Sequence, residues 1–407
     1  MWNKMITLIL SLLLAVAVAG CGQKAPSSDT PTDAPSEKTT EAEEGQTLDH
    51  YSEIADQEGH VIGKIPRGVS ATACDAGLFY SIFQPAENEF TATAEYRFFR
   101  TEDRKDIRLG LLSDQGYEAV FTRTELGGVI YTLAVTGNPM DFEKDTLWLL
   151  AFDPMKETMQ QYKVSEYGFP YTAMASSNGR LYIMNHEQDK QSLDKIYEFD
   201  PETGKVREVL TYQNSRDSLR SVAAAEDGFY VLNLKIRDEG NELWLEHYDL
   251  SGKKVSEQQA HDVMAKAAQE INGLSRDDLQ NEFGMMVSDF AVIDGRYLFY
   301  ENFGITRIAV DLETEEVLFA GTDLMNMSKG SGVKMIYKLS FADDPEETPE
   351  IYAFRDGAFD EATFEPKDER VHLQSISSSP GGTWAVRMVN SDQRDPDGVD
   401  LIYLFIE

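Results

Sequence analysis

Three aspartates near the end of the chain have the spacing best suited to holding a metal ion. Asp395, Asp397 and Asp400 lie around Gly398 in the run Asp-Pro-Asp-Gly-Val-Asp. Closely spaced carboxylate oxygens around a glycine turn are ligands that Ca²⁺ prefers. When Gly398 is aligned with the sixth position of a helix-loop-helix calcium loop, neither end position falls on a calcium ligand. We therefore expect either a local Ca²⁺ site or an ordinary hairpin loop, and no other cofactor.

Histidine is the side chain that most readily exchanges protons near neutral pH. The 6 histidines of the chain show no metal-ligand spacing. His186 alone falls in a segment rich in carboxylates, where a carboxylate neighbour would raise its pKa. It is therefore an acid–base candidate, and an exposed loop histidine is the alternative. The sequence contains no Gly-x-Ser-x-Gly elbow, phosphate-binding glycine loop or His-Glu-x-x-His motif, so it predicts no specific enzyme activity.

The charge of the chain excludes one large class of partner. Of its 407 residues, 37 are Lys or Arg and 71 are Asp or Glu, which gives a formal net charge of −34. Nucleic-acid binding depends on a cationic surface that displaces counterions. We therefore expect no nucleic-acid partner.

The start of the chain predicts an extracytoplasmic address. Residues 1–20 have the form of a signal peptide, with Lys4 before an apolar run that is too short to span a bilayer of about 30 Å. The run ends in Val18-Ala19-Gly20-Cys21, which resembles the bacterial lipoprotein box. This resemblance implies that Cys21 is acylated and begins the mature chain, which would place it on the outer face of the cell membrane. The only other cysteine, Cys74, is expected to be a buried apolar residue.

Residues 21–59 are expected to form a disordered tether behind the lipidated cysteine, because they are rich in Pro, Ser, Thr, Glu and Asp and contain few large apolar residues. Residues 60–407 then repeat a pattern about every 50 residues, in which a turn glycine precedes an apolar run. Tyr80, Tyr131 and Tyr182 mark this repeat at intervals of 51 residues. An aspartate that suits a tight turn follows at Asp153, Asp200, Asp249 and Asp311.

Units of four short strands without intervening helices predict an all-β fold, a β-propeller. Dividing the length by the repeat gives seven four-stranded blades, with six or eight as alternatives. The last run, 401–406, is apolar on both faces and needs a covering strand. The strand predicted at 60–66 precedes the first blade, so we expect it to close the ring beside that run.

One turn carries a further resemblance. The segment Asp200-Pro201-Glu202-Thr203-Gly204-Lys205-Val206 resembles the repeat of PQQ-like bacterial propellers. Lipid-anchored members of that group are similar to this chain in their expected cellular location and in their architecture. Quinoprotein repeats carry a docking tryptophan shortly after this turn, where Val209 and Leu210 stand here, which argues against a quinone cofactor.

In such blades the second-to-third connections open at one end of the propeller. We place them at 85–95, 137–145, 185–194, 235–242, 301–304, 342–350 and 389–400. These 63 residues contain 22 acidic and 5 basic side chains. A strongly negative face is therefore expected, which attracts a basic protein, a cation or an envelope glycan, or else serves only solubility.

An insert at about 256–284 separates the fourth and fifth blades. We expect Ser256 to cap a helix whose apolar stripe includes Val263, Met264 and Ala267, and a second short helix to follow at 275–284. This insert is either a lid or a helical ornament packed on the blades. The leading function is a membrane-anchored binding or scaffolding module that uses the acidic face. The alternative is a propeller hydrolase or lyase acting on cell-wall or extracellular polysaccharide through paired carboxylates.

Overall fold

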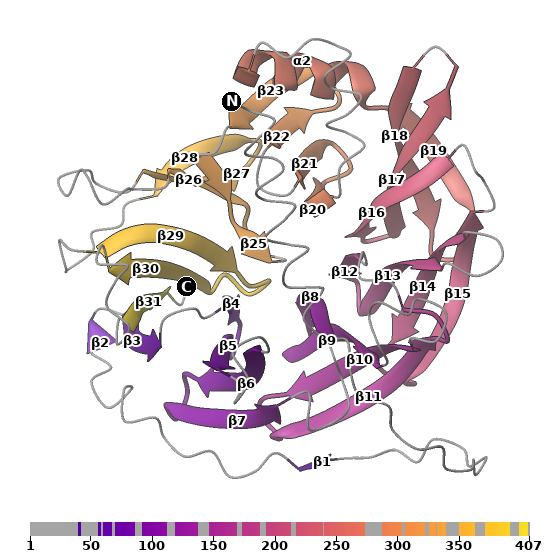
Figure 1. Cartoon of the computed structure of the whole chain (residues 1–407). Coiled ribbons are helices and arrows are strands. Elements are labelled where there is room, and N and C mark those ends of the chain that lie inside the picture. The colour runs from indigo at the N-terminus through magenta and orange to yellow at the C-terminus, as the bar shows by residue number, and fades with distance from the viewer. Residues whose placement is uncertain are drawn as a thin grey trace, which may run out of the picture.

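The protein is a β-propeller (Figure 1). This computed structural model describes residues 40–41, 56–57, 60–66, 70–85, 92–111, 119–136, 146–168, 173–187, 193–212, 217–238, 240–272, 287–302, 306–321, 325–330, 332–338, 350–362, 371–390 and 399–405. Hydrogen bonds group the described strands into seven sheets around a common centre. The predicted all-β propeller of four-stranded blades is confirmed.

Six blades each take four strands in chain order, antiparallel to one another. The first comprises β4 (Ser70–Cys74), β5 (Gly77–Pro85), β6 (Ala92–Arg100) and β7 (Lys105–Leu111). The second comprises β8 (Ala119–Leu126), β9 (Val129–Thr136), β10 (Thr146–Asp153) and β11 (Thr158–Ser165). The third comprises β12 (Ala173–Ser177), β13 (Arg180–Glu187), β14 (Leu193–Asp200) and β15 (Lys205–Tyr212).

The next three blades follow the same plan. The fourth comprises β16 (Asp217–Ala225), β17 (Gly228–Arg237), β18 (Gly240–Asp249) and β19 (Lys254–Gln259). The fifth comprises β20 (Val287–Ile293), β21 (Tyr297–Asn302), β22 (Thr306–Asp311) and β23 (Glu316–Gly321). The sixth comprises β24 (Met325–Met327), β26 (Met335–Lys338), β27 (Ile351–Arg355) and β28 (Ala358–Ala362).

The last sheet closes the ring by joining the two ends of the propeller's chain. It contains β29 (Val371–Ser378), β30 (Trp384–Asn390), β31 (Val399–Phe405) and β3 (His60–Pro66). β3 pairs antiparallel with β31 along its whole length, from His60 opposite Phe405 to Pro66 opposite Val399. The predicted closing strand is therefore confirmed. A short β25 (Lys329–Gly330) adds to β29 on the other side.

Two short strands lie inside the segment that we predicted to be a tether. β1 (Thr40–Glu41) pairs with β11 at the rim of the second blade, and β2 (Asp56–Gln57) pairs with β3. At these two points the segment is therefore hydrogen-bonded to the propeller. Residues 42–55 lie outside the described residues.

Apolar side chains fill the spaces between neighbouring blades. Cys74, Phe79 and Phe98 of the first blade pack against Ile130 and Phe152 of the second, and comparable clusters follow around the ring. The three tyrosines that mark the repeat are all buried in second strands. Tyr131 and Tyr182 occupy the same core position in successive blades, whereas Tyr80 lies one residue further from its turn.

A single described helix, α2 (His261–Asn272), follows β19 and packs against β18, β22 and β23. Val263, Met264 and Ala267 are buried in the core between the fourth and fifth blades, so the ornament interpretation fits these contacts better than a lid. The predicted start at Ser256 is wrong, because this residue lies in β19 and pairs with His247 of β18. The predicted helix at 275–284 lies outside the described residues. No helix in the described part is long and apolar enough to span a membrane.

Candidate functional site

The two ends of the propeller differ in how the strands are joined. Tight turns link first to second and third to fourth strands, and we call this side the tight-turn end. The aspartates predicted in four of these turns each accept a backbone N–H of the turn, at Asp153, Asp200, Asp249 and Asp311. The second-to-third connections open on the opposite side, the long-loop end. Most of their residues lie outside the described ranges.

The predicted lipid and metal sites also fall largely beyond the described part of the chain. Cys21, Asp395 and Asp397 are not among the described residues. Asp400 lies in β31, where it pairs with Ile65 of β3. In the ranges that the structure describes, no three His, Cys, Asp or Glu side chains gather as a metal site. The Ca²⁺ site at Asp395, Asp397 and Asp400 therefore stays a prediction.

Four carboxylates that we assigned to exposed acidic loops are buried in the blades. They are Glu95, Glu187, Asp194 and Glu301. Glu95 pairs with Arg97 at 2.5 Å, and Glu187 pairs with Lys195 at 2.8 Å. The expectation that they face solvent is wrong, because β6, β13, β14 and β21 extend further toward the loops than the sequence pattern indicated. Their charges are compensated inside the fold and do not add to a solvent-exposed face.

His186 lies in a strand and has a carboxylate neighbour. It belongs to β13, and its Nδ1 contacts a carboxylate oxygen of Asp194, its cross-strand partner on β14. The second oxygen of Asp194 accepts the N–H of Leu219 from the next blade at 2.8 Å. A histidine held by a carboxylate that is itself held by a third group is the arrangement expected of an acid–base residue. The described contacts thus keep His186 as a candidate.

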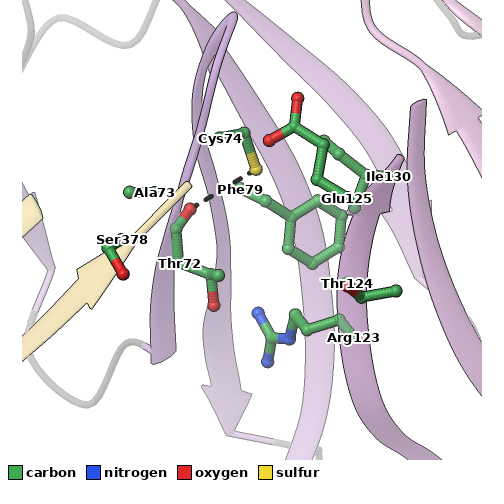
Figure 2. Close-up of a pocket in the computed structure, with 9 residues that line it drawn as sticks. All are labelled: Thr72, Ala73, Cys74, Phe79, Arg123, Thr124, Glu125, Ile130 and Ser378. Atoms are coloured by element: carbon green, nitrogen blue, oxygen red, sulfur yellow. Dashed lines mark hydrogen bonds between the residues drawn. The ribbon is translucent and has the colours of Figure 1, made fainter. Parts of the chain in front are cut away.

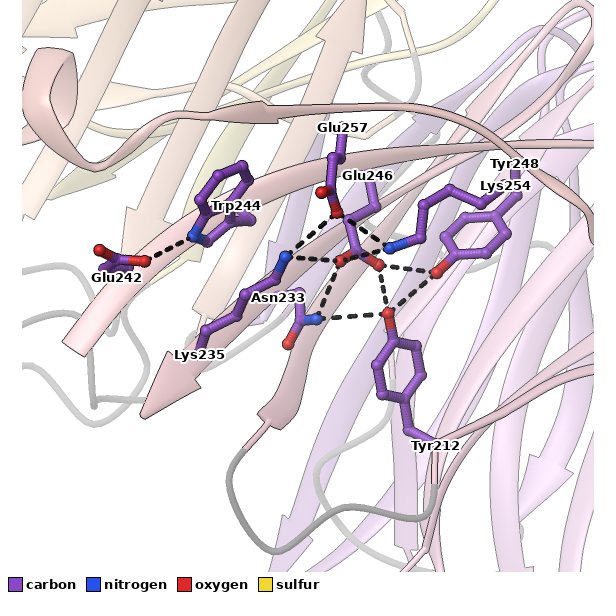
Figure 3. Close-up of polar contacts among 9 residues, drawn as sticks. All are labelled: Tyr212, Asn233, Lys235, Glu242, Trp244, Glu246, Tyr248, Lys254 and Glu257. Carbon is purple, nitrogen blue, oxygen red and sulfur yellow. Dashed lines mark hydrogen bonds and ion pairs between the residues drawn. The ribbon is translucent and has the colours of Figure 1, made fainter. Parts of the chain in front are cut away.

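A dense polar network lies between the third and fourth blades (Figure 3). At its centre, the Glu246 side chain of β18 is fully buried. Its hydrogen-bond and ion-pair partners are Tyr212, Asn233, Lys235, Tyr248 and Lys254. Tyr212 comes from β15 of the preceding blade, so this carboxylate connects two blades.

The electrostatics of the network mark it as structural. Burial alone would raise the pKa of Glu246, but hydrogen bonds from Tyr212, Tyr248 and Lys254 lower it to about 2. Burial and the hydrogen bond to Glu246 raise the pKa of Tyr248 far above its ordinary value. Glu246 is therefore a carboxylate and Tyr248 a neutral phenol at neutral pH. Neither group is poised to exchange a proton.

A small pocket lies where the closing sheet meets the first and second blades (Figure 2). Its walls come from β4, β5, β8, β9 and β29 at the tight-turn end. Its volume of about 10 Å³ is near the lower limit for holding one water molecule. The pocket is therefore too small for an organic ligand as it stands.

Glu125 is the charged group in this pocket with an unusual environment. Its side chain is 4 % exposed, and its Oε2 accepts the N–H of Asp75 at 2.8 Å. Its Oε1 has no hydrogen-bond partner among the described residues. Burial raises the pKa of Glu125 to about 7; the hydrogen bond from the Asp75 N–H acts against this rise, and the negative charge of Asp75 adds to it. This carboxyl therefore changes its protonation state near neutral pH.

Cys74 and Arg123 are the other two ionisable groups that line the pocket. Burial and the nearby Glu125 raise the pKa of the Cys74 thiol well above its ordinary value, so it remains a neutral thiol. The predicted role of Cys74 as a buried apolar residue is confirmed, since it packs in the core between the first two blades. The Arg123 guanidinium lies over the Phe79 ring, 5.1 Å from its centre.

Sequence reasoning missed Glu125 and Glu246. A signal for Glu125 is present in the repeat, because Glu125 and Ser176 are 51 residues apart and occupy matching positions near the ends of two successive first strands, opposite Ile130 and Leu181. At this position Glu125 accepts a hydrogen bond from Asp75 of the first blade and Ser176 donates one to Glu125 of the second, so both residues contact the preceding blade. A charged residue at a core position of a repeat is therefore a candidate for a special role.

Comparison with known proteins shows no family for this chain. No known protein family matches the sequence, and no curated protein matches it. A chain of the solved mitotic checkpoint complex is 10% identical, with a TM-score of 0.44 over 95% of this chain and 98% of that one. An acylaminoacyl peptidase is 9% identical, with a TM-score of 0.43 over 68% of this chain and 44% of that one. The Pyrococcus horikoshii acylaminoacyl peptidase is 9% identical, with a TM-score of 0.41 over 66% of this chain and 42% of that one. This chain therefore spans under half of the length of either peptidase.

Proposed function

We propose that the chain is a lipid-anchored, extracytoplasmic binding or scaffolding module whose recognition surface is the long-loop end of the propeller. The observation that supports this proposal most is that the propeller has a tight-turn end and a long-loop end. The 63 residues that we assign to the second-to-third connections hold 22 acidic and 5 basic side chains. A large acidic surplus persists after the four buried carboxylates are discounted.

A basic segment of another protein is the partner that such a surface suits best. Like charges gathered on one face attract opposite charge and speed encounter with it. The packed blades hold the loop ends in fixed relative positions, which lowers the ordering that binding requires. The propeller would thus present several acidic loops to one partner at the same time.

Oligolysine binding by two charge-matched variants tests this assignment. The loop variant carries Asp343→Asn, Asp344→Asn, Glu346→Gln and Glu347→Gln. The control variant neutralises four exposed acids at the tight-turn end, namely Glu102→Gln, Glu202→Gln, Glu226→Gln and Glu313→Gln. We expect the loop variant to lose affinity several-fold more than the control, although both lose the same net charge. Equal losses would show that only the total charge matters.

Membrane attachment has its own test. Cys21→Ser removes the thiol that would carry the lipid, so the protein should leave the membrane fraction or remain unprocessed. Fractionation and mass spectrometry of the N-terminus measure both outcomes. Normal cleavage with unchanged membrane retention would contradict the proposed anchor.

The His186–Asp194 contact favours a second candidate function, hydrolysis or elimination on an envelope polysaccharide. A paired histidine can act as an acid or a base in either reaction. Incubation with a glycan array followed by product analysis separates the two functions. Turnover that is lost in His186→Gln supports an enzyme, whereas binding without any product supports the module.

A further inference from the structure

A path of hydrogen bonds crosses three boundaries between blades at the tight-turn end. Gly381 in the closing sheet donates its N–H to Asp75 Oδ1 at 2.7 Å. Asp75 in the first blade donates its own N–H to Glu125 Oε2 in the second blade at 2.8 Å. Ser176 in the third blade donates its hydroxyl to the Glu125 carbonyl oxygen at 2.9 Å. Glu125 therefore takes part in two of these connections.

This path lies beside the seam at which the ring closes. The closing sheet and the first blade also meet where Ala73 donates its N–H to Ser377 Oγ at 2.8 Å. The closing sheet is the one that combines the two ends of the propeller's chain. A change in the Asp75–Glu125 contact thus acts at the junction on which closure depends.

The Glu125 carboxyl is poorly accommodated as an ion. One oxygen is held by the Asp75 amide, and the other faces a pocket with room for about one water molecule. An ionised carboxylate normally accepts several hydrogen bonds, and burying it without them is costly. Figure 2 shows the carboxyl pointing toward the Cys74 sulfur, which is a weak partner.

The groups around Glu125 do little to favour its charged form. The titratable or charged groups that line its surroundings are Asp75 and Cys74 from β4 and its turn, and Arg123 from its own strand. The remaining elements contribute Phe79, Ile130, Ser176 and Ser378, which carry no charge. Burial opposes ionisation of Glu125 most strongly; the N–H of Asp75 favours the charged form, while the negative charge of Asp75 opposes it. Cys74 remains a neutral thiol.

We propose that Glu125 forms a pH-sensitive contact between blades. When protonated it holds the closing sheet, the first blade and the second blade together, and when ionised it loosens this junction. Ionisation places a second negative charge beside Asp75, whose own carboxylate holds Gly381. It also leaves Oε1 as a buried, unsatisfied anion. The junction should therefore be tighter in a mildly acidic medium than in a mildly alkaline one.

Nuclear magnetic resonance of the unmodified folded protein tests this pH-sensitive contact directly. The Glu125 carboxyl carbon, assigned through its own backbone, should titrate with a midpoint of about 7, as its buried position implies. The Asp75 and Gly381 amides should shift with the same midpoint, because the hydrogen-bonded path joins them to Glu125. A midpoint near the ordinary glutamate value, or a Gly381 amide that does not follow, would overturn the proposal.

Melting temperatures between pH 5.5 and 8.5 give a second test. Glu125→Gln keeps the shape of the protonated side chain, so relative to this variant the wild type should lose thermal stability as pH rises toward about 7 and change little above that value. The exposed Glu226→Gln is the control and should follow the wild-type profile. Parallel profiles of melting temperature against pH for wild type and Glu125→Gln would contradict the proposed pH-sensitive contact. If Glu125→Gln does not fold, the wild-type titration above decides alone.

Discussion

At the scale of single residues, the surroundings of two glutamates shift their pKa values in opposite directions. Glu246 and Glu125 are both buried. Five donors surround Glu246, so its charged form is stabilised and its pKa falls to about 2. Burial raises the pKa of Glu125 to about 7, because the single backbone hydrogen bond that its carboxyl accepts is too little to offset it and the charge of Asp75 lies nearby. Burial alone therefore does not predict the pKa of a carboxyl; the number of its hydrogen-bond donors must be known as well.

Glu246→Gln should destabilise the fold by about 3–5 kcal/mol near neutral pH, because it leaves two lysines facing a neutral amide inside the network. The folded pKa of Glu246 lies below its unfolded value, so its contribution is complete above about pH 4.5 and is lost as pH falls toward 2. The difference between wild type and variant should therefore shrink by about 3 kcal/mol across that window.

Urea denaturation from pH 6 to pH 2.5 measures this difference. Glu242→Gln serves as the control, since Glu242 is less buried and binds Trp244 instead of the central lysines. A constant gap between wild type and Glu246→Gln at all pH values would mean that the network does not hold Glu246 as a carboxylate.

These two residues also show what the sequence could not supply. The spacing of Glu125 and Ser176 follows from the repeat, and the burial of Cys74 was predicted from its apolar neighbours. The partners of Glu246 come from β15, β17, β18 and β19, which converge only after two blades have packed. Such convergence depends on tertiary register, to which a single sequence gives little access.

At the scale of elements, the closing strand was predictable and the insert was less so. The run 401–406 is apolar on both faces, which required a partner that only the strand at 60–66 could supply. By contrast, residues 254–259 have a polar composition that suits a helix start as well as a rim strand. Pairing with β18 decides between them, because it completes the fourth strand of a blade.

Two nested truncations test closure. Deleting residues 22–55 removes the pairing of β1 with β11 but keeps β2 and β3, so we expect a small change in melting temperature. Extending the deletion through Pro66 removes the whole β3–β31 ladder and exposes β31 as an edge. We expect this to cost at least about 3 kcal/mol, since several backbone hydrogen bonds are lost. Equal melting temperatures for the two truncations would show that β3 is dispensable.

The helix offers a second test at this scale. Met264 is fully buried between α2 and the blades, whereas Lys266 on the same helix is exposed. Met264→Ala should destabilise the domain by about 2–5 kcal/mol, and Lys266→Ala should have almost no effect. Calorimetry of both variants measures this. A Met264→Ala variant as stable as Lys266→Ala would favour a mobile lid over a packed ornament.

At the scale of the whole molecule, the net charge of −34 acts on the fold as self-repulsion. Ion pairs inside the blades, such as those of Glu95, Glu187 and Glu246 with basic residues, leave this net charge unchanged. Added salt should therefore stabilise the domain by screening, with most of the effect present at about 0.15 M, where the Debye length is about 8 Å.

A calcium site at Asp395, Asp397 and Asp400 would add to this screening in a way that salt alone cannot. At constant ionic strength, a specific site stabilises the folded state with rising Ca²⁺, by about 2.7 kcal/mol at a hundredfold excess over Kd. Calorimetric melts in Ca²⁺, Mg²⁺ and matched NaCl, with Asp397→Asn as the site variant, separate the two effects. We expect Asp397→Asn to remove a Ca²⁺-specific increment while leaving the response to NaCl unchanged. If Ca²⁺ stabilises no more than Mg²⁺, and the variant matches the wild type in both, these aspartates form an ordinary hairpin loop and contribute only charge to the long-loop end.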